Sequence, residues 1–225
     1  MKKRYIVLLT LAGSLPVIWT FARLTNALQW YTIPTTSNYP SLKLGDHVFG
    51  SNLVKPNRFD FITYRAEIPN MGVQTMTHRL CGVEGDMIQI KGGDLYINNK
   101  LFDKTLTLAH YYTMEQRDYK RLDSLEQLNE QNIVVIGKDS FMTNVSDRSI
   151  QLLTIKASRK VLLPTETDEL IQNRYHKRWN SDNFGPLKVP KGKYFVLGDN
   201  RNSAQDSRYL GFIDKSNYLT TLLNH

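Results

Sequence analysis

Cysteine is nearly absent from this chain: Cys81 is the only one in 225 residues. A single thiol excludes an intramolecular disulfide and any metal site built from several cysteines. Cys81 lies in an apolar stretch, so we interpret it as a small hydrophobic side chain of the interior and not as a reactive thiol.

Nucleic-acid motifs are absent as well. The sequence has no zinc-finger spacing and no basic helix, and its net charge of +8 comes from lysines and arginines spread along the chain. Such charge suits an anionic membrane surface as readily as nucleic acid. Without a motif for nucleic acid, we expect a lipid bilayer as partner and no nucleic acid. Repeats and low-complexity tracts are also missing. The length of 225 residues suits one domain with an insertion, or one membrane anchor plus one domain.

Charged residues are missing from one stretch near the N-terminus. A positive cluster, Lys2-Lys3-Arg4, precedes an uncharged run from Tyr5 to Ala22. As a helix these ~18 residues would span about 27 Å, close to the thickness of a bilayer's hydrocarbon core. We therefore predict a membrane anchor in residues 1–24, with the N-terminus in the cytoplasm and the rest outside. A cleavable signal peptide is the alternative, but no small-x-small site follows the run, which favours an uncleaved anchor.

From Thr32 onward the sequence favours short strands separated by turns. Alternating or continuous apolar residues, bounded by Gly, Pro, Asn and Asp, predict strands at Val48–Val54, Phe59–Tyr64, Gln74–Val83, Met87–Lys91, Asp94–Ile97 and Tyr194–Leu197. Gly92-Gly93 predicts a tight turn that joins Met87–Lys91 and Asp94–Ile97 into a hairpin. We predict a mainly β protein: a transmembrane helix, then an antiparallel catalytic domain over 25–102 and 181–225.

Residues 103–180 differ in sequence pattern from the flanking segments, and we predict that they form a small inserted α+β subdomain. A weak amphipathic pattern predicts a helix over Glu115–Gln131, and apolar runs predict strands at Ile133–Gly137 and Ile150–Ile155. Pro164 with the polar residues after it predicts the start of a short helix that runs through Ile171.

The most specific pattern lies near the C-terminus. After the strand Tyr194–Leu197 come Gly198-Asp199-Asn200-Arg201 and then Asp206-Ser207-Arg208. This segment resembles the C-terminal signature of type I signal peptidases, the serine peptidases known as bacterial leader peptidases. Ala204 departs from it, because the family usually has serine there. We expect Asp199, Arg201, Ser207 and Arg208 to shape the loop, through Asp199–Arg201 and Asp206–Arg208 ion pairs.

The resemblance extends to a segment that would carry the nucleophile. Ser37-Asn38-Tyr39-Pro40-Ser41-Leu42 with Gly45-Asp46 is similar to the family's Ser-Met-x-Pro-Thr-Leu-x-x-Gly-Asp. It implies that Ser37 attacks the scissile carbonyl, and that Thr35 and the Ser37 backbone N–H form the oxyanion hole. Asn38 replaces the family's methionine, so the resemblance places Asn38 and Tyr39 at the substrate cleft. Without the resemblance, Ser37 would be an ordinary loop serine.

The base position holds the most informative substitution. Thr77-His78-Arg79 through Gly85-Asp86 resembles the bacterial Lys-Arg-x-x-Gly-x-Pro-Gly-Asp, with His78 in place of the catalytic lysine. Histidine titrates near 6.5 and needs no large pKa shift to accept a proton at neutral pH. In the lysine enzymes the serine at the position of Ala204 bonds the lysine amine, so Ala204 fits the loss of that amine. An aspartate, Asp206 or else Asp199, would orient the ring.

Together these features imply a bacterial serine endopeptidase in the cytoplasmic membrane, single-pass, with its catalytic domain outside. It would remove signal peptides from exported preproteins with a Ser37–His78 or a Ser37–His78–Asp206 site, and without a cofactor or metal. One alternative stays open, a catalytically silent membrane-anchored paralogue that binds signal peptides or a partner protein. A self-cleaving repressor of similar fold lacks support, because no DNA-binding module precedes the catalytic part.

Overall fold

Seven strands form the central sheet of the computed structural model, which describes residues 14–126 and 133–223. Their order across the sheet is β1-β2-β15-β3-β4-β13-β14, and the paired neighbours run antiparallel. The strands are β1 (Gln29–Thr32), β2 (His47–Ser51), β3 (Phe61–Ile68), β4 (Gly72–Val83), β13 (Lys193–Leu197), β14 (Ile213–Asp214) and β15 (Tyr218–Leu222). The prediction of a mainly antiparallel β fold is confirmed.

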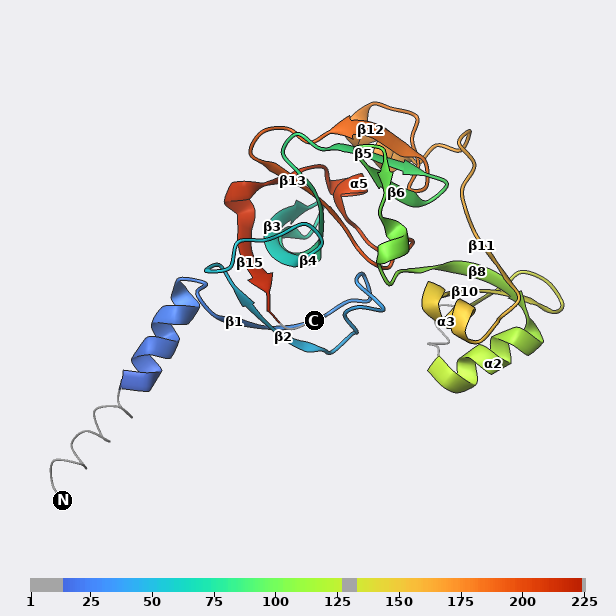
Figure 1. The fold of residues 1–225 in the computed structure, drawn as a ribbon, viewed down its shortest axis with the longest axis horizontal. Helices are drawn as coiled ribbons and strands as arrows, with labels where there is room; N and C mark the ends of the chain where they lie inside the picture. Colours follow the sequence, from blue (N-terminus) through green and yellow to red (C-terminus); the bar gives the residue numbers. More distant parts are fainter. Residues whose placement is uncertain (1–13, 127–132, 224–225) are drawn as a thin grey trace, which may run out of the picture.

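A second sheet, in the order β12-β5-β6-β7, packs beside the first (Figure 1). It contains β5 (Met87–Lys91), β6 (Asp94–Ile97), β7 (Lys100–Leu101) and β12 (Phe184–Lys188). The β5–β6 hairpin has the predicted bounds. Gly92 and Gly93 both have positive φ, 57° and 83°, which is the backbone conformation that a two-residue hairpin turn requires.

A third sheet lies to one side of the other two in Figure 1, in the order β11-β8-β10-β9. Its strands and the helices packed on it are β8 (Ala109–Glu115), β9 (Ile133–Val135), β10 (Ser140–Ser146), β11 (Ala157–Arg159), α2 (Gln116–Glu126) and α3 (Asp147–Leu152). These elements all fall within the segment 103–180 that we expected to be an insertion. The expected helix Glu115–Gln131 is observed as α2, with residues 127–132 outside the described part.

One predicted strand of this region is wrong. Residues Ile150–Ile155 are not extended, because Asp147–Leu152 form the helix α3. Ile150 and Leu153 are three residues apart and both pack against Met114, Leu122 and Val145. Spacing of three suits one face of a helix, so packing of this face decided the structure over local strand preference.

Four further helices are short: η1 (Asp103–Thr105), α4 (Glu169–Tyr175), α5 (Ser207–Leu210) and η3 (Lys215–Asn217). The first three border the core of the second sheet, and the fourth, η3, contacts β3. Asp168 caps α4 by accepting from the Leu170 and Ile171 backbone N–H groups. Ile171 is fully buried in this core although it belongs to the 103–180 segment.

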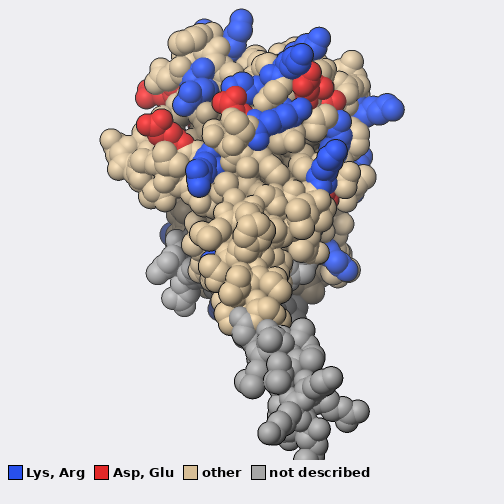
Figure 2. All heavy atoms as spheres, turned by 90° about the vertical axis from the view of Figure 1, so that its left-hand side faces the viewer, with Lys and Arg blue, Asp and Glu red and all other residues tan. Residues whose placement is uncertain are grey.

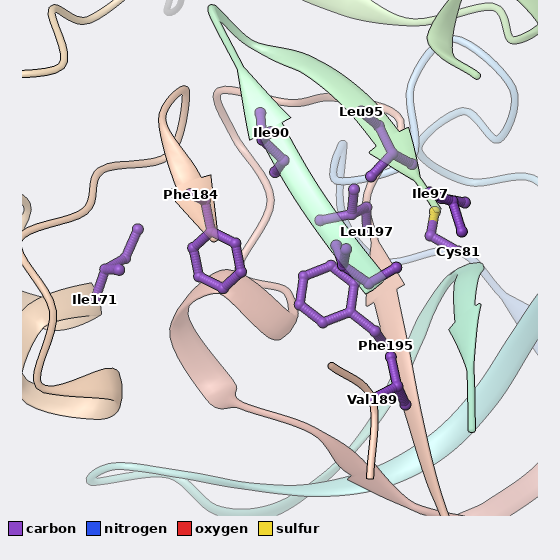
Figure 3. Close-up of a cluster of buried hydrophobic side chains, with 10 residues drawn as sticks. Cys81, Ile90, Leu95, Ile97, Ile171, Phe184, Val189, Phe195 and Leu197 are labelled. Atoms are coloured by element: carbon purple, nitrogen blue, oxygen red, sulfur yellow. The ribbon is translucent and has the colours of Figure 1, made fainter. Parts of the chain in front are cut away.

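The largest cluster of buried side chains joins the first two sheets (Figure 3). It brings Phe195 and Leu197 of β13 together with Ile90 of β5, Leu95 of β6 and Phe184 of β12. Cys81 is buried in this cluster, and burial raises the pKa of its thiol to about 12. The cluster therefore fixes β13, and with it the start of the loop that follows Leu197.

A helix at residues 14–24 projects from the body of the molecule (Figure 1). The predicted anchor falls largely on residues 1–13, which lie outside the described part. Within residues 14–126 and 133–223, no helix has the length and apolar character needed to cross a membrane. Figure 2 shows that charged side chains gather on the part of this face distant from the helix, and that the part nearest to it is largely without them.

Candidate active site

The segment with the expected nucleophile is the loop between β1 and β2. Buried Ile33 and Leu42 hold its two ends in one apolar cluster. Between them Ser37 is partly exposed, and its hydroxyl accepts a hydrogen bond of 3.2 Å from Thr35 Oγ1. The Ser37 backbone N–H donates to the same Thr35 oxygen at 3.4 Å. The structure thus brings the three expected groups, the Ser37 hydroxyl, the Ser37 N–H and the Thr35 hydroxyl, to one point.

Asn38 fixes this loop to the neighbouring strand β4. Its side chain is only 2% exposed, and Nδ2 donates to the Thr77 carbonyl at 2.7 Å. Its Oδ1 is buried and has no hydrogen-bond partner among the described residues. We expected Asn38 beside the substrate, but the structure turns it inward, next to the base position, while Tyr39 is half-buried.

His78 lies on β4 and is completely buried. Its Nδ1 is 2.8 Å from the Tyr64 hydroxyl, and its Nε2 has no hydrogen-bond partner in the described part of the chain. Burial lowers the pKa of His78 to about 4, and the nearby Asp206 carboxylate only partly opposes that shift. The imidazole is therefore neutral at physiological pH, with one ring nitrogen able to accept a proton.

Gly198 is the point where the two expected catalytic segments meet. An added Cβ at Gly198 would collide with the Ser37 carbonyl oxygen and with Ala204 Cβ, and would lie 3.4 Å from His78 Cδ2. The backbone of Ser37, the His78 ring and Ala204 therefore surround one glycine. Only glycine leaves enough space for these three parts of the chain to approach so closely.

The loop after Gly198 is held by buried ion pairs. Asp206 and Arg208 pair at 2.8 Å, as expected. The expected Asp199–Arg201 pair is wrong, because each residue has a partner from a distant segment: Asp199 pairs with Arg79 of β4, and Arg201 pairs with Asp103. The side chains of all three pairs are nearly inaccessible to solvent.

Two serine hydroxyls add hydrogen bonds to the loop after Gly198 and its ion pairs. Ser41 Oγ donates to Asp199 Oδ2 at 2.5 Å, and Ser207 Oγ accepts from the Val196 N–H at 2.9 Å. Charges without water are costly unless paired and hydrogen bonded, and this network supplies partners for them. Asp199, Arg201, Ser207 and Arg208 thus occupy structural positions in the loop.

Asp206 has a different place from the one we expected. Its carboxylate accepts from Arg208 and from the Gly198 N–H at 3.0 Å, whereas Tyr64 is the partner of His78 Nδ1. Burial alone would raise the pKa of Asp206, but the adjacent Arg208 guanidinium lowers it, so the carboxylate is charged. Asp206 acts on the imidazole through its charge, not through a hydrogen bond, and neither does Asp199 bond the ring.

Sequence reasoning missed Tyr64, Arg79 as an ion-pair partner, and Asp103. Tyr64 had a detectable signal, because Ile62 pairs with His78 across the β3–β4 hairpin. Residues two apart on a strand share a face, so Tyr64 is a diagonal neighbour of His78. The sequence had no such signal for Asp103, since its partner Arg201 is far away in sequence. Among the described residues, no group of three or more His, Cys, Asp or Glu side chains is arranged to hold a metal ion.

Comparison with known proteins gives a consistent assignment. The family model "signal peptidase, peptidase S26" matches residues 3–223. The signal peptidase I of Aquifex aeolicus is 28% identical over 204 residues, which cover 84% of this chain and 72% of that protein. The signal peptidase I of Rickettsia prowazekii is 31% identical over 188 residues, covering 81% of this chain and 58% of that protein.

Among solved structures, a signal peptidase I from Enterococcus faecalis aligns with 76% of this chain and 98% of its own, at 23% identity and a TM-score of 0.36. The family match rests on the sequence, which is covered almost from end to end. This chain therefore belongs to the signal peptidase I family of serine endopeptidases.

Proposed function

We propose that this protein removes signal peptides from exported preproteins, with Ser37 as nucleophile and His78 as general base. The observation that carries the proposal is the meeting of both segments at Gly198, where the Ser37 backbone and the His78 ring flank the same glycine. A nucleophile needs a base held near it by the fold, and this arrangement supports His78 in that role.

The reaction would follow the order of serine peptidases. His78 Nε2 takes the hydroxyl proton of Ser37 as Oγ attacks the scissile carbonyl carbon. The negative charge on the carbonyl oxygen is then stabilised by the Thr35 hydroxyl and the Ser37 N–H, which already lie side by side. His78 returns the proton to the leaving amine, and water hydrolyses the acyl-enzyme by the same route. Since Nε2 has no partner among the residues that the structure describes, substrate binding would complete the Ser37–His78 bond.

Tyr64 would set the tautomer of the base. Burial raises the pKa of Tyr64 well above its usual range, so its hydroxyl keeps its proton. If the Tyr64 oxygen accepts from Nδ1–H, the lone pair of His78 is on Nε2, where proton transfer requires it. The hydrogen bond from Nδ1–H to Tyr64 thereby takes the place of the bond to an aspartate in many Ser–His sites.

The apolar surface near the N-terminal helix supports attachment to a bilayer. Large hydrophobic side chains of residues 14–24 are exposed, and Trp30 and Leu53 continue this surface on the body. Figure 2 shows few charges around the base of the helix. A cluster of exposed apolar side chains marks a membrane or protein contact. We include in the proposal the single-pass anchor at residues 1–24, in the cytoplasmic membrane of a bacterium, with the catalytic domain outside.

The test is preprotein processing by the purified full-length protein in liposomes. Ser37→Ala and His78→Ala should each reduce kcat/KM by about 10⁴-fold, with an unchanged melting temperature for Ser37→Ala. Ser203→Ala is a matched control, because Ser203 lies exposed in the loop after Gly198 and should process at the wild-type rate. Full activity of Ser37→Ala would refute the proposal. Wild-type protein that binds signal peptides without cleaving them would favour the silent paralogue.

A further inference from the structure

Asn144 belongs to the third sheet, yet its side chain reaches the loop after Gly198. Asn144 Nδ2 donates to Asn200 Oδ1 at 2.7 Å, and both side chains are buried. Asn144 is on β10, within the 103–180 segment, and the family signature described above does not include it. A buried amide–amide hydrogen bond of this kind rigidifies the two parts of the fold that it joins.

Asn200 passes this contact on to the nucleophile loop. Its Nδ2 donates to the Thr36 carbonyl at 3.1 Å, and its backbone N–H donates to the Ser37 carbonyl at 3.1 Å. A backbone carbonyl can only accept, so the Asn200 amide nitrogen must face Thr36. Its Oδ1 must then face the other way, toward a donor, and Asn144 is that donor.

The Thr36 carbonyl has a direct connection to the proposed chemistry. The peptide unit is planar, so the Thr36 carbonyl and the Ser37 N–H lie in one plane and point in opposite directions. A hydrogen bond to the carbonyl limits rotation of this plane and so fixes the direction of the N–H. It also polarises the peptide, which makes the N–H a stronger donor.

The backbone of the third sheet keeps Asn144 and Asn200 in register. Ala109, the first residue of β8, accepts from the Arg201 N–H and donates to the Asp199 carbonyl, both at 3.0 Å. Ala109 and Asn200 thereby form a parallel bridge between the sheet and the loop. Because β10 pairs with β8, Asn144 is held beside this bridge.

We propose that Asn144 is a positioning residue: it orients the Asn200 amide, which aligns the Ser37 N–H as oxyanion donor. This inference rests on the proposed function, because it takes Ser37 as the nucleophile. It gives the third sheet a part in the reaction without contact with substrate. The effect of a substitution should fall on kcat, because the oxyanion forms only in the transition state.

The main test is Asn144→Asp, which keeps the shape of the side chain and removes its donor. The carboxylate repels Asn200 Oδ1 and favours the flipped amide, whose oxygen would oppose the Thr36 carbonyl. Complete loss of one oxyanion donor costs about 10² to 10³ in kcat, so misalignment should cost about 10-fold or more, with KM within about twofold. Asn144→Ala should give a loss of the same kind and serves if Asn144→Asp does not fold.

Two comparisons exclude a merely structural role. Asn202→Ala removes another bond between loop and sheet, from the Tyr111 N–H to Asn202 Oδ1 at 2.9 Å, without touching the Thr36–Ser37 peptide. Asn202→Ala should change the melting temperature about as much as Asn144→Ala does, yet leave kcat within about twofold of the wild-type value. Asn144→Ala combined with Asn200→Ala should lose no more than Asn200→Ala alone, because both act through one chain of bonds.

The outcomes separate this inference from the proposed function. If Ser37→Ala is inactive while folded Asn144→Asp and Asn144→Ala keep the wild-type kcat, the positioning role is refuted and the Ser–His site stands. If Asn202→Ala lowers kcat as much as Asn144→Ala does, the effect is general loosening of the loop and the inference fails. If Ser37→Ala is itself active, both are overturned.

Discussion

Complete burial of His78, the proposed base, leads to a prediction about pH that differs from that for an ordinary histidine. Burial lowers the pKa of His78 to about 4, compared with about 6.5 for an imidazole in water. Only the neutral ring accepts the proton of Ser37, so kcat/KM should rise with pH through the pKa of the free enzyme. At pH 5.5 a pKa of 4 leaves about 97% of the base neutral, whereas a pKa of 6.5 would leave about 9%.

The assay is a pH series of kcat/KM with a quenched fluorescent signal-peptide substrate, from pH 4 to 8. We expect a nearly flat profile down to about pH 5 and a fall only below it. Protein fluorescence at each pH verifies folding, since the same shift affects stability. The folded-state pKa is depressed, so the stability from neutral His78 is complete above pH 6.5 and is lost as pH falls to about 4, on the order of 3 kcal/mol. A fall of kcat/KM near pH 6.5 in folded protein would refute the reasoning, because it would require a hydrated imidazole.

Two further predictions concern the oxyanion hole and the buried ion pairs. Thr35→Ala removes the hydroxyl beside Ser37 and should lower kcat by about 10²-fold, whereas Thr35→Ser should keep most of the rate; equal kcat values for the two variants would exclude Thr35 as a donor. Asp103→Asn leaves the buried Arg201 guanidinium without its counter-ion and should cost about 3–5 kcal/mol in urea unfolding, while Glu84→Gln, at the exposed pair with Lys215, should leave the midpoint unchanged. A small effect of Asp103→Asn would mean that water reaches Arg201.

Local patterns were sufficient where one segment determines its own structure. The β5–β6 hairpin needed only alternating residues and two glycines, and it has the predicted bounds. The signature segments led to Ser37, His78 and Gly198, which the structure brings together. Residues 150–155 show the limit of this approach, because their packing against Met114 and Val145 selected a helix.

The partners of the charged residues could not be predicted from local sequence. Asp199 and Arg201 are two residues apart, yet each pairs with a residue about a hundred positions away. Such pairings depend on which strands become neighbours, and a single sequence does not contain that information directly. The same holds for Asn144, on β10 of the third sheet, and Asn200, in the loop after β13. Tyr64 is intermediate, since the register of one hairpin would have identified it.

The position of β15 in the central sheet has a consequence for synthesis of the protein. This strand, the last in the described part of the chain, lies between β2 and β3. Both of its neighbours come from the first third of the sequence. The loop that holds the Ser37 backbone also comes late, at residues 198–200. A ribosome must therefore release the chain through β15 before the sheet can close and the proposed site can assemble. If the proposed site is correct, a nascent chain that lacks these residues cannot cleave a substrate, because its topology leaves the site unassembled.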